Sequence, residues 1–553
     1  MKLAKKKRVL ILGGGFAGVF TAKRLAKIAG TEVEIVLVNE RNFFVFQPLL
    51  PEVAAGAITA TDAISPLRLL LRDIQIRQAT ILGIDFDAQK ATIVQGTGRI
   101  PVELDYDHLV IALGQTVNLG NFPGMADHGL TIKNLGDAHR LRNKVIWCLE
   151  NAENAATDRA RRELLTFVVV GAGFSGVETA GEIKALIDHS LKFYPNIDAS
   201  EIRVLLVEYA DRILRELPED LADYAKERLQ EQGIEVLNGV GTDRATVTSV
   251  SLTNGEVIPT RTIVATIGTA PHDLVAGLPL EFQWGRIKVD RRLRALSDVQ
   301  PRNNIWAIGD AALIPLNDNP QEPKDFAPPT AQFAVREGTQ LAENILAEIK
   351  GQPLRDFAYT SKGSLASLGT SKAVAQVYGI KMSGTIAWLL WRSFYVSFLP
   401  GMAARTRVLI NWFLNSFAPR NIVQVHHKTD PATRTVHYSA GDIVFAPGWM
   451  ADGFYTVLTG SFDLEVEHPD TGEITRRILN EGDHFGERVL LGTSSSTGLV
   501  KARENATVLW IAKDDFKRFT RGFPRLNDYF ERYIDEHYDQ EIEQTGEQSK
   551  KAK

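Results

Sequence analysis

Residues 9–18, VLILGGGFAG, and residues 167–176, FVVVGAGFSG, are two copies of one pattern, an apolar run that opens directly into GxGxxG. Each copy predicts a buried β-strand, a tight glycine turn and the start of an α-helix, which is how a Rossmann-type dinucleotide-binding unit begins. One copy would bind one dinucleotide. Two copies, about one domain length apart, indicate two dinucleotides held face to face, as electron transfer between them requires.

The glycines of the two copies have separate geometric roles. The first glycine of each copy allows the tight turn out of the strand, the second lets the main chain approach a pyrophosphate, and the third lets the helix pack close to the sheet. The pyrophosphate then lies at the helix N-terminus, where free N–H groups and the helix dipole favour an anion. We therefore expect six glycines to build the two sites, namely Gly13, Gly15, Gly18, Gly171, Gly173 and Gly176.

The strands that follow the two copies end in acidic residues. VEIVLVNE and IRVLLVE end at Glu40 and Glu208, where a carboxylate can accept hydrogen bonds from ribose hydroxyls. In the first unit the strand register places Asn39 opposite Glu208, so Asn39 and Glu40 both remain candidates for the ribose ligand. The agreement of these flanks disfavours the alternative of two glycine turns in an ordinary α/β protein.

A third apolar run, NNIWAIGDAAL at residues 303–313, ends in Gly309 and Asp310. An acid after such a glycine can hold the ribityl or phosphate groups of a flavin. Together with ALG at residues 112–114 and the two glycine turns, this run resembles the flavoprotein disulfide reductase superfamily, whose members have two dinucleotide domains. The resemblance implies FAD on the first, interrupted domain and NAD(P)H on the inserted second domain.

The composition fits a soluble or membrane-peripheral enzyme. The chain has 553 residues, of which 44% are hydrophobic and 24% are charged, so its length suggests three or four domains. The net charge of −4 and the lack of a basic stripe argue against nucleic-acid binding, and we expect no metal site. KKKR at residues 5–8 is followed at once by the first Rossmann strand, so we expect no signal peptide and a cytoplasmic protein.

The single cysteine, Cys148, limits the redox chemistry. Disulfide reductases, their peroxidase relatives and sulfide:quinone reductases need one or two redox-active cysteines beside the flavin. Cys148 lies in KVIWCLE, a helical, half-apolar stretch that is distant in sequence from every cofactor motif. We therefore expect a packed helix residue, which disfavours those branches of the superfamily.

Four further segments narrow the resemblance. They are NFFVFQPLLPEVAAGAI at residues 42–58, GVETAGEI at 176–183, APPTAQFAVREG at 327–338 and LGTSKAVAQVYGIKMSGTIAWLLWR at 368–392. Over residues 8–425 the chain resembles type II NADH:quinone oxidoreductases, which are single-subunit, non-pumping flavoenzymes of respiratory membranes. The resemblance implies FAD-dependent oxidation of NADH, two-electron transfer to a membrane quinone, and a homodimer. Two alternatives stay open: an NAD(P)H dehydrogenase with a non-quinone acceptor, and a redox-sensing signalling flavoprotein.

The same resemblance implies three catalytic residues, Glu178, Gln332 and Lys372. It puts Glu178 near the flavin and nicotinamide rings, where a carboxylate can position a ring or relay a proton; the alternative is an acid that satisfies the helix dipole. It puts Ala331 and Gln332 against the flavin, where N–H groups at a helix start would stabilise the anionic reduced ring. Lys372 is a candidate for the quinone entrance or a proton path, or else an exposed structural lysine.

The sequence departs from the family pattern after Gln332. The family usually carries a second glutamine four residues later, whereas this chain has Arg336 and Glu337, which changes the expected quinone pocket. The other cofactor contacts that the resemblance implies are Phe16, Ala17, Ala112, Gly114 and Gly268.

Residues 386–417 have the composition of membrane-interface helices. They contain Trp388, Trp391 and Trp412 among leucines and phenylalanines, with arginines interleaved. Every uncharged run in this stretch is shorter than the roughly 20 residues that span a bilayer. Apolar faces flanked by tryptophan and arginine are typical of helices that lie in the interface. We therefore expect peripheral attachment to the cytoplasmic face of the cell membrane; the alternative is a buried helical hairpin at a dimer interface.

The composition changes after residue 425, where short alternating segments separated by Gly and Asp predict an all-β roll. The phrases AGDIVFAPG, FYTVLTGSFDL and EGDHFGE resemble the cyclic-nucleotide-binding domain over about residues 433–519. The resemblance implies Glu487 as the ribose ligand, but the position of the phosphate-binding arginine falls on Ser496. We therefore expect weak or no binding of cAMP or cGMP at residues 484–499. Another ligand, a docked partner and a stabilised oligomer are the alternatives.

We expect an α/β fold with two Rossmann-like dinucleotide-binding domains, in which the NADH domain interrupts the FAD domain. An amphipathic membrane-association segment and an all-β roll with flanking helices follow. The expected boundaries are 1–135 for the first part of the FAD domain, 136–295 for the NADH domain, 296–350 for the second part of the FAD domain, 351–425 for the C-terminal strands and membrane-binding helices, 426–540 for the cyclic-nucleotide-binding-like roll and 541–553 for a disordered tail.

Overall fold

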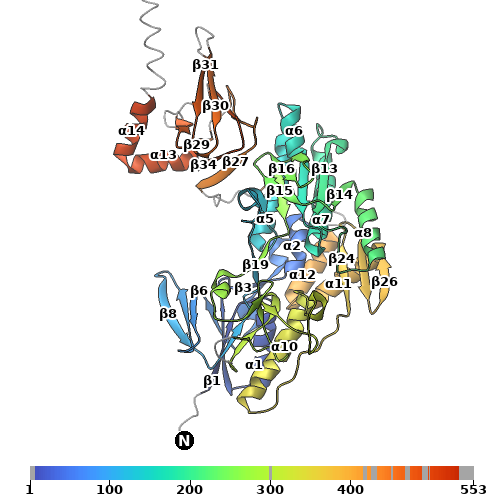
Figure 1. The fold of residues 1–553 in the computed structure, drawn as a ribbon. Helices are drawn as coiled ribbons and strands as arrows, with labels where there is room; N and C mark the ends of the chain where they lie inside the picture. The colour runs from blue at the N-terminus through green and yellow to red at the C-terminus, as the bar shows by residue number, and fades with distance from the viewer. Residues whose placement is uncertain are drawn as a thin grey trace, which may run out of the picture.

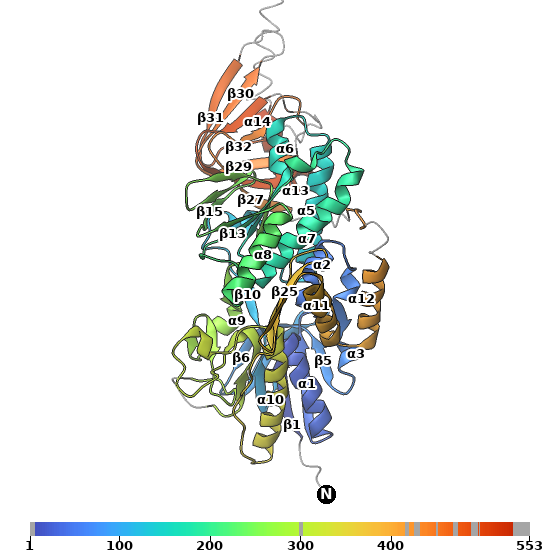
Figure 2. The same ribbon diagram turned by 90° about the vertical axis from the view of Figure 1, so that its right-hand side faces the viewer.

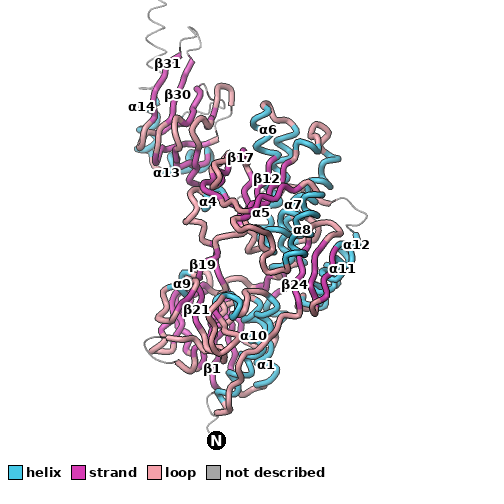
Figure 3. Tube along the Cα trace, turned by 45° about the vertical axis from the view of Figure 1, so that its right-hand side comes forward, coloured by secondary structure: helices cyan, strands magenta, loops and turns pink. Residues whose placement is uncertain are grey.

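The computed structural model describes residues 6–297, 302–414, 420–424, 432–449, 452–467, 474–487, 496 and 498–534. Figure 1 shows two α/β units, with the β-rich C-terminal part at the end away from the N-terminus. The colours of Figure 3 show helices and strands mixed in both units, whereas strands predominate in the C-terminal part. The tail expected at residues 541–553 lies outside the described residues.

The first α/β unit is built on a parallel five-stranded sheet with the order β22-β9-β1-β2-β5. The strands are β22 (Ile305–Ala307), β9 (His108–Ile111), β1 (Lys7–Leu12), β2 (Val33–Asn39) and β5 (Gln75–Gln78). The apolar residues 9–12 of the central strand β1 are fully buried, as expected for a parallel sheet that is covered on both faces. Strand β22 follows the second unit in sequence, so the chain leaves this sheet and later returns to it.

Helices α1 (Phe16–Ala29) and α10 (Ala331–Ile349) pack tightly against each other beside this sheet. Gly338 permits the close approach, because a Cβ at that position would lie 2.5 Å from the carbonyl oxygen of Ala17. The packing brings the start of α10 close to the glycine turn that precedes α1.

The second α/β unit repeats the design with the strand order β11-β18-β12-β13-β14, also parallel. The strands are β11 (Gly129–Leu130), β18 (Thr262–Ala265), β12 (Thr166–Val170), β13 (Arg203–Glu208) and β14 (Ile234–Asn238). The main helices are α5 (Leu135–Glu153), α7 (Phe174–Ser190) and α8 (Glu219–Glu231). Cys148 of α5 is fully buried with its Sγ 3.3 Å from Thr262 Oγ1, and burial raises the pKa of the thiol. The prediction of a packed helix cysteine is confirmed.

Smaller elements complete the two units. The short helices are α2 (Leu50–Ala54), α3 (Leu67–Leu70), α4 (Met125–His128), α6 (Asp158–Leu165) and α9 (Asp273–Ala276). The small sheets pair β3 (Phe43–Val45) with β4 (Ile64–Pro66), β6 (Thr80–Asp85) with β7 (Lys90–Gln95) and β8 (Ile100–Asp105), β15 (Thr242–Ala245) with β16 (Ser249–Leu252) and β17 (Val257–Pro259), and β20 (Phe282–Gln283) with β21 (Arg286–Lys288) and β23 (Ala312–Leu313). The antiparallel pair β10 (Gln115–Val117) and β19 (Thr269–Pro271) forms where the chain passes between the units.

Three antiparallel strands and two helices follow α10. They are β24 (Gly363–Ser367), β25 (Ala373–Val377), β26 (Ile380–Ser383), α11 (Gly384–Phe398) and α12 (Met402–Leu414). Figure 2 shows α11 and α12 side by side at the edge of the molecule. Their outward side carries apolar side chains that are more than half exposed, namely Ile386, Leu389, Met402, Leu409, Ile410, Phe413 and Leu414. None of the helices in the described ranges is long and apolar enough to cross a bilayer.

The tryptophans of these helices do not have the environment that the sequence suggested. Trp391 and Trp412 are only 1% and 6% exposed, and each indole N–H donates to a buried carboxylate, Glu178 and Glu52 respectively. The expectation that these two tryptophans lie in a membrane interface is therefore wrong, since a buried indole is held by its hydrogen-bond acceptor inside the protein.

The C-terminal part is a roll of two antiparallel four-stranded sheets, β27-β34-β29-β32 and β28-β33-β30-β31. The strands are β27 (Thr433–Tyr438), β28 (Ile443–Phe445), β29 (Gly453–Thr459), β30 (Phe462–Glu467), β31 (Ile474–Leu479), β32 (His484–Phe485), β33 (Gly498–Ala502) and β34 (Ala506–Ala512), and the helices α13 (Lys513–Gly522) and α14 (Pro524–Ile534) follow. An apolar cluster that includes the fully buried Phe462 and Phe485 fills the roll. The predicted fold class, two Rossmann-like units followed by an all-β roll, is confirmed.

The roll contacts the second α/β unit through hydrogen bonds, of which the one between Asp442 and Thr248 is buried. Asp442 is 4% exposed and accepts hydrogen bonds from Arg159 Nη2 (2.6 Å) on α6 and from Thr248 Oγ1 (2.8 Å). Val247 donates its backbone N–H to the carbonyl oxygen of His437 (3.1 Å) and packs against the core of the roll. Helix α4 lies beside the roll in Figure 3 and contacts β27.

Candidate active site

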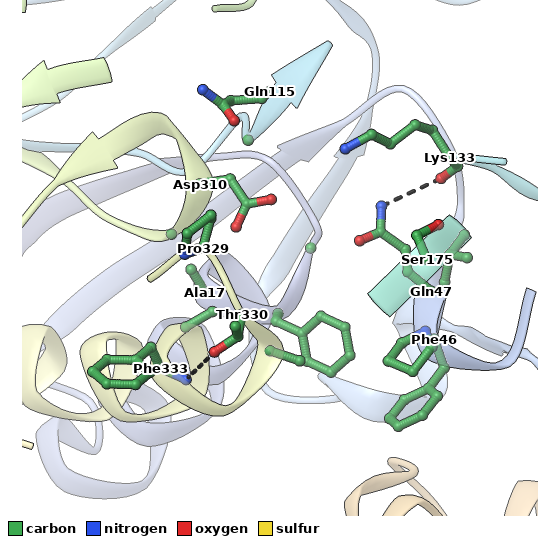
Figure 4. A pocket seen from close by; sticks show the side chains of 18 of the residues that line it. Ala17, Phe46, Gln47, Gln115, Lys133, Ser175, Asp310, Pro329, Thr330 and Phe333 are labelled. Atoms are coloured by element: carbon green, nitrogen blue, oxygen red, sulfur yellow. Dashed lines mark hydrogen bonds between the residues drawn. The ribbon is translucent and has the colours of Figure 1, made fainter. Parts of the chain in front are cut away.

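A cavity of about 800 Å³ opens between the two α/β units. Figure 4 shows its wall, with Asp310 and the start of α10 on one side and Ser175 and Gln47 on the other. The sequence-predicted residues that line it are Gly13, Gly15, Phe16, Ala17, Asn39, Glu40, Ala112, Gly114, Glu178, Gly309, Asp310, Ala331 and Gln332. The predicted residues outside its lining are Gly18, Gly171, Gly173, Gly176, Glu208, Gly268 and Lys372.

The glycine turn after β1 forms a cradle that only glycine can build. Gly13 has φ +109°, and a Cβ there would lie 2.2 Å from the carbonyl oxygen of Ala112. Gly15 instead faces open space, since a Cβ there would meet nothing within 4 Å, so a phosphate group can approach the main chain at this point. The turn and the first helical N–H groups of α1 fit the pyrophosphate of a dinucleotide.

The turn after β12 has the same geometry in the second unit. Gly171 has φ +96°, and a Cβ on Gly176 would lie 1.8 Å from the Gly171 carbonyl oxygen, whereas Gly173 faces open space. The second unit therefore carries an equivalent dinucleotide cradle, with Phe174 and Ser175 of its helix start reaching the shared cavity.

The side chains at the ends of β2 and β13 hold these turns. Asn39 Oδ1 accepts from Gly14 N (2.8 Å), and Glu208 Oε2 accepts from Ala172 N (2.6 Å) at the corresponding place. The structural equivalent of Glu208 is therefore Asn39, while the exposed Glu40 lines the cavity one residue further on. Asn39 and Glu40 both remain candidates for the ribose ligand.

Helix α10 begins at the cavity. Thr330 precedes the helix, and Ala331 and Gln332 form its first turn in the cavity wall, so the positive end of the helix dipole points toward the space where a ring would bind. The Gln332 side chain is held in place, since its Oε1 accepts from Tyr359 OH (2.6 Å) and its Nε2 donates to the carbonyl oxygen of Gly363 (3.2 Å).

Arg336 and Glu337, where the sequence departs from the family pattern, both have partners inside the protein. Glu337 is buried, and its Oε2 accepts from Gly309 N (2.8 Å), so it holds the turn that presents Asp310 to the cavity. Burial raises the pKa of Glu337 to about 7. The Arg336 guanidinium lies over the ring of Tyr359, 4.8 Å from its centroid, and is absent from the cavity lining.

Glu178 is a buried acid in the cavity wall. It is 5% exposed, and its Oε1 accepts from Ser367 N of β24 (3.1 Å) and from Trp391 Nε1 of α11 (3.0 Å). Burial raises the pKa of Glu178 from 4.5 to about 8, the two hydrogen bonds oppose this shift, and the carboxylates of Glu52 and Glu182 add to it. Its hydrogen bonds come from other elements, so the alternative of an acid that satisfies the dipole of its own helix has no support.

Two further buried acids, Glu52 and Glu182, were not singled out from the sequence. Glu52 Oε2 accepts from Trp412 Nε1 (2.7 Å), and Arg420 Nη1 lies 3.4 Å from Glu182 Oε2. Burial and the nearby Glu182 raise the pKa of Glu52 to about 7. For Glu52 the sequence did contain a signal, since this acid lies inside the apolar run LLPEVA. A carboxylate in a buried segment needs a hydrogen-bond or charged partner.

Lys372 is not brought to the cavity. Its Nζ lies 3.8 Å from Glu231 Oε2 of α8, as in an exposed structural lysine. In the roll, Glu487 is fully buried and the backbone of Ser496 pairs with Trp449 and Gly448, but the rest of the predicted cassette at 488–495 and 497 lies outside the described residues.

Three family models match the chain. Residues 7–338 match the pyridine nucleotide-disulphide oxidoreductase model, residues 361–421 match the NDH2 C-terminal domain, and residues 435–522 match the cyclic nucleotide-binding domain.

Curated relatives cover the same part of the chain. The type II NADH:quinone oxidoreductase Ndh of Mycobacterium tuberculosis is 30% identical over 433 residues, which are 75% of this chain and 89% of the relative. The demethylphylloquinone reductase NdbB of Synechocystis is 32% identical over 414 residues, 73% of this chain and 95% of the relative. The solved structure of NDH2 from Plasmodium falciparum in complex with NADH has a TM-score of 0.69 at 21% identity, covering 76% of this chain and 100% of that one.

Proposed function

The chain belongs to the pyridine nucleotide-disulphide oxidoreductase family and, within it, to the type II NADH:quinone oxidoreductases, and from this premise we propose how its residues carry the reaction. It is an FAD-dependent enzyme that converts NADH, one proton and a quinone into NAD⁺ and quinol, without proton pumping. FAD, when bound, supplies the ring that accepts the hydride and returns two electrons. The function expected from the sequence is confirmed at this level.

The cavity residues fit the two dinucleotides. We propose that the turn at Gly13 and Gly15 binds the FAD pyrophosphate and that Asp310 accepts hydrogen bonds from its hydroxyl groups. The first turn of α10, at Ala331 and Gln332, stabilises negative charge through its N–H groups and dipole. Glu208 accepts hydrogen bonds from the NADH ribose and repels a 2′-phosphate.

The buried carboxyl group of Glu178 in the cavity wall is the observation that carries the proposed mechanism. Quinone reduction takes up one proton from solvent for each NADH, and a protonated side chain beside the acceptor can deliver it. With a pKa of about 8, Glu178 is mostly protonated at neutral pH and can donate its proton to a quinone oxygen. Turnover with quinone should therefore fall as the pH rises through about 8.

Stopped-flow measurement of the two half-reactions tests this role. In Glu178→Gln, flavin reduction by NADH should persist, whereas reoxidation by quinone should slow by about 10²-fold or more and lose its alkaline decline. Ferricyanide, which accepts electrons without taking up protons, should reoxidise both proteins equally well. An alkaline decline that survives in Glu178→Gln would show that another group supplies the proton.

We propose that α11 and α12 bind the membrane surface through their exposed apolar side chains. The outward face that includes Ile386, Leu389 and Phe413 can insert into the interface as a monotopic helix pair does. The C-terminal turns of α11 carry Phe394 and Phe398, which line the cavity. A quinone that enters from the lipid can therefore follow α11 to the site.

The roll is proposed as a regulatory module of the NADH-binding unit. Its contacts through Asp442 and His437 support this, because a ligand that changes the roll would act directly on α6 and on the hairpin at Thr248. The homodimer and the cytoplasmic face of the membrane stay predictions.

A further inference from the structure

Glu178 receives its hydrogen bonds from elements that are distant in sequence, and both reach one oxygen. The N–H of Ser367 on β24 and the indole N–H of Trp391 on α11 both donate to Oε1. Among the described residues these are the donors to this carboxyl group. Of the two carboxyl oxygens, the one that accepts two N–H donors is the less basic. The proton of the neutral acid therefore belongs on Oε2.

Trp391 lies behind the cavity wall, in contact with two residues that line it, Glu178 and Tyr395. The indole is 1% exposed, packs edge-on against Tyr395 with the ring centroids 4.8 Å apart, and is absent from the cavity lining, so it does not touch an acceptor. It lies on the helix that also carries the exposed Ile386 and Leu389. The donor to the proposed acid therefore comes from the proposed membrane-contacting helix.

We propose that Trp391 is a positioning residue for quinone reduction, whose indole N–H fixes Glu178 in the orientation that leaves the proton on Oε2 and sets the proton affinity of this acid. The proposal rests on the proposed role of Glu178 as the proton donor. An N–H donor stabilises the carboxylate more than the neutral acid, so loss of the indole N–H favours the protonated form.

Other ionisable groups act on Glu178 from the elements packed around it. Glu182 lies one turn further along α7, Glu52 faces it from α2, and Tyr395 faces it from α11, while β24 contributes a backbone N–H and has no ionisable side chain. Glu52 and Glu182 are in turn held by the two arginines Arg392 and Arg420. The ionisable residues elsewhere in the cavity lining are Glu40, Arg41, Lys133, Glu216, His272 and Asp310.

The test removes the N–H and keeps the bulk. Two variants of the FAD-loaded full chain do this: Trp391→Phe, and incorporation of 3-benzothienylalanine at position 391, which keeps the bicyclic shape and lacks the donor. Trp388→Phe is the matched control, since Trp388 is a half-buried tryptophan one turn earlier on the same helix. Its ring lies against the guanidinium of Arg392, with the Arg392 Cζ 3.7 Å from the ring centroid. Stopped-flow reoxidation by quinone is measured from pH 6 to 10. The carboxyl band of Glu178 is titrated by infrared difference spectroscopy against Glu178→Gln.

In both Trp391 variants the infrared titration should give a higher pKa for Glu178 than in the unaltered protein. The alkaline decline of quinone turnover should move up by about one pH unit. The kcat at pH 6 should fall several-fold through lost orientation, with KM for quinone and flavin reduction by NADH unchanged. Trp388→Phe should leave both titrations in place.

Equal pKa values in the unaltered protein and in both Trp391 variants would overturn the proposal, as would an equal shift in Trp388→Phe. Failure of the underlying function is distinguishable, because an alkaline decline that persists in Glu178→Gln would refute the role of Glu178 itself. A decline that vanishes in Glu178→Gln and stays unshifted in the Trp391 variants would refute the role of Trp391 alone.

Discussion

Replacing Asp442 by alanine should release the roll from the NADH-binding unit. The carboxylate is 4% exposed and accepts from Arg159 and Thr248 across the interface, and from the N–H of Ser439 (2.9 Å) within the roll. Alanine removes both contacts across the interface and leaves the buried Thr248 hydroxyl without its acceptor.

The expected loss of docking free energy is about 1.5–4 kcal/mol. The bond from the buried Thr248 to a charged acceptor contributes about 1.5–3 kcal/mol. The Arg159 side chain is 56% exposed and keeps Glu163 as a second partner, so its ion pair adds only up to about 1 kcal/mol. The undocked population should therefore rise by about 10- to 700-fold.

Hydrogen exchange measures this population at one amide. The Val247 N–H donates to the carbonyl oxygen of His437 across the interface, so its protection should fall by that factor in Asp442→Ala. The neighbouring Thr246 N–H bonds to the carbonyl oxygen of Ser249 within its own hairpin, and its protection should change less.

The matched control is Asp463→Ala, which removes a half-exposed carboxylate 3.4 Å from Arg503 inside the roll and should leave the Val247 amide unchanged. If Val247 exchanges equally fast in Asp442→Ala and in the unaltered protein, Asp442 does not hold the two parts together and the reasoning fails.

Four further changes test the remaining assignments. Glu208→Gln should raise kcat/KM for NADPH relative to NADH about tenfold, because a like charge near the 2′-phosphate is removed; equal values for the two cofactors in the unaltered enzyme would contradict this. Ile410→Glu combined with Phe413→Glu should weaken binding to anionic liposomes about tenfold or more in flotation assays, since both side chains are more than half exposed on α12, while reduction of a soluble dye by NADH stays the same. Arg336→Gln should leave both quinone turnover and flavin reduction by NADH unchanged, because the guanidinium packs on Tyr359 outside the cavity lining; a rise in quinone turnover alone would show that this arginine restricts the acceptor. Ser496→Arg should raise the affinity for cAMP in calorimetry by about tenfold or more, because a guanidinium restores charge-assisted phosphate contacts, and tight binding by the unaltered protein would refute the premise.

Much of the fold was predictable because its signals are local. The strand, turn and helix around Gly13 and Gly171 depend on neighbouring residues, since a left-handed turn and a close helix need glycine at fixed spacing. The packed state of Cys148 followed in the same way from the apolar side of its helix. The equivalence of Asn39 and Glu208 was also predictable, because both end a strand at the same register.

The membrane helices show where local signals stop. Helix α11 is apolar on several sides, so its sequence indicates burial or membrane contact without deciding which side has which neighbour. The structure turns Trp391 inward, where its indole N–H donates to the carboxyl group of Glu178, and leaves Ile386 on the exposed side.

The amino-acid sequence by itself determined the two dinucleotide cradles, the β-roll and the family, since each is indicated by short motifs whose residues lie a few positions apart. Only the tertiary structure decided the surroundings of the acids. Glu178 meets Trp391 across 213 positions, Glu52 meets Trp412 across 360, and Asp442 meets Thr248 across 194. The proton affinity of a carboxyl group is set by burial and by its donors, and both arise from packing between segments that no local pattern connects.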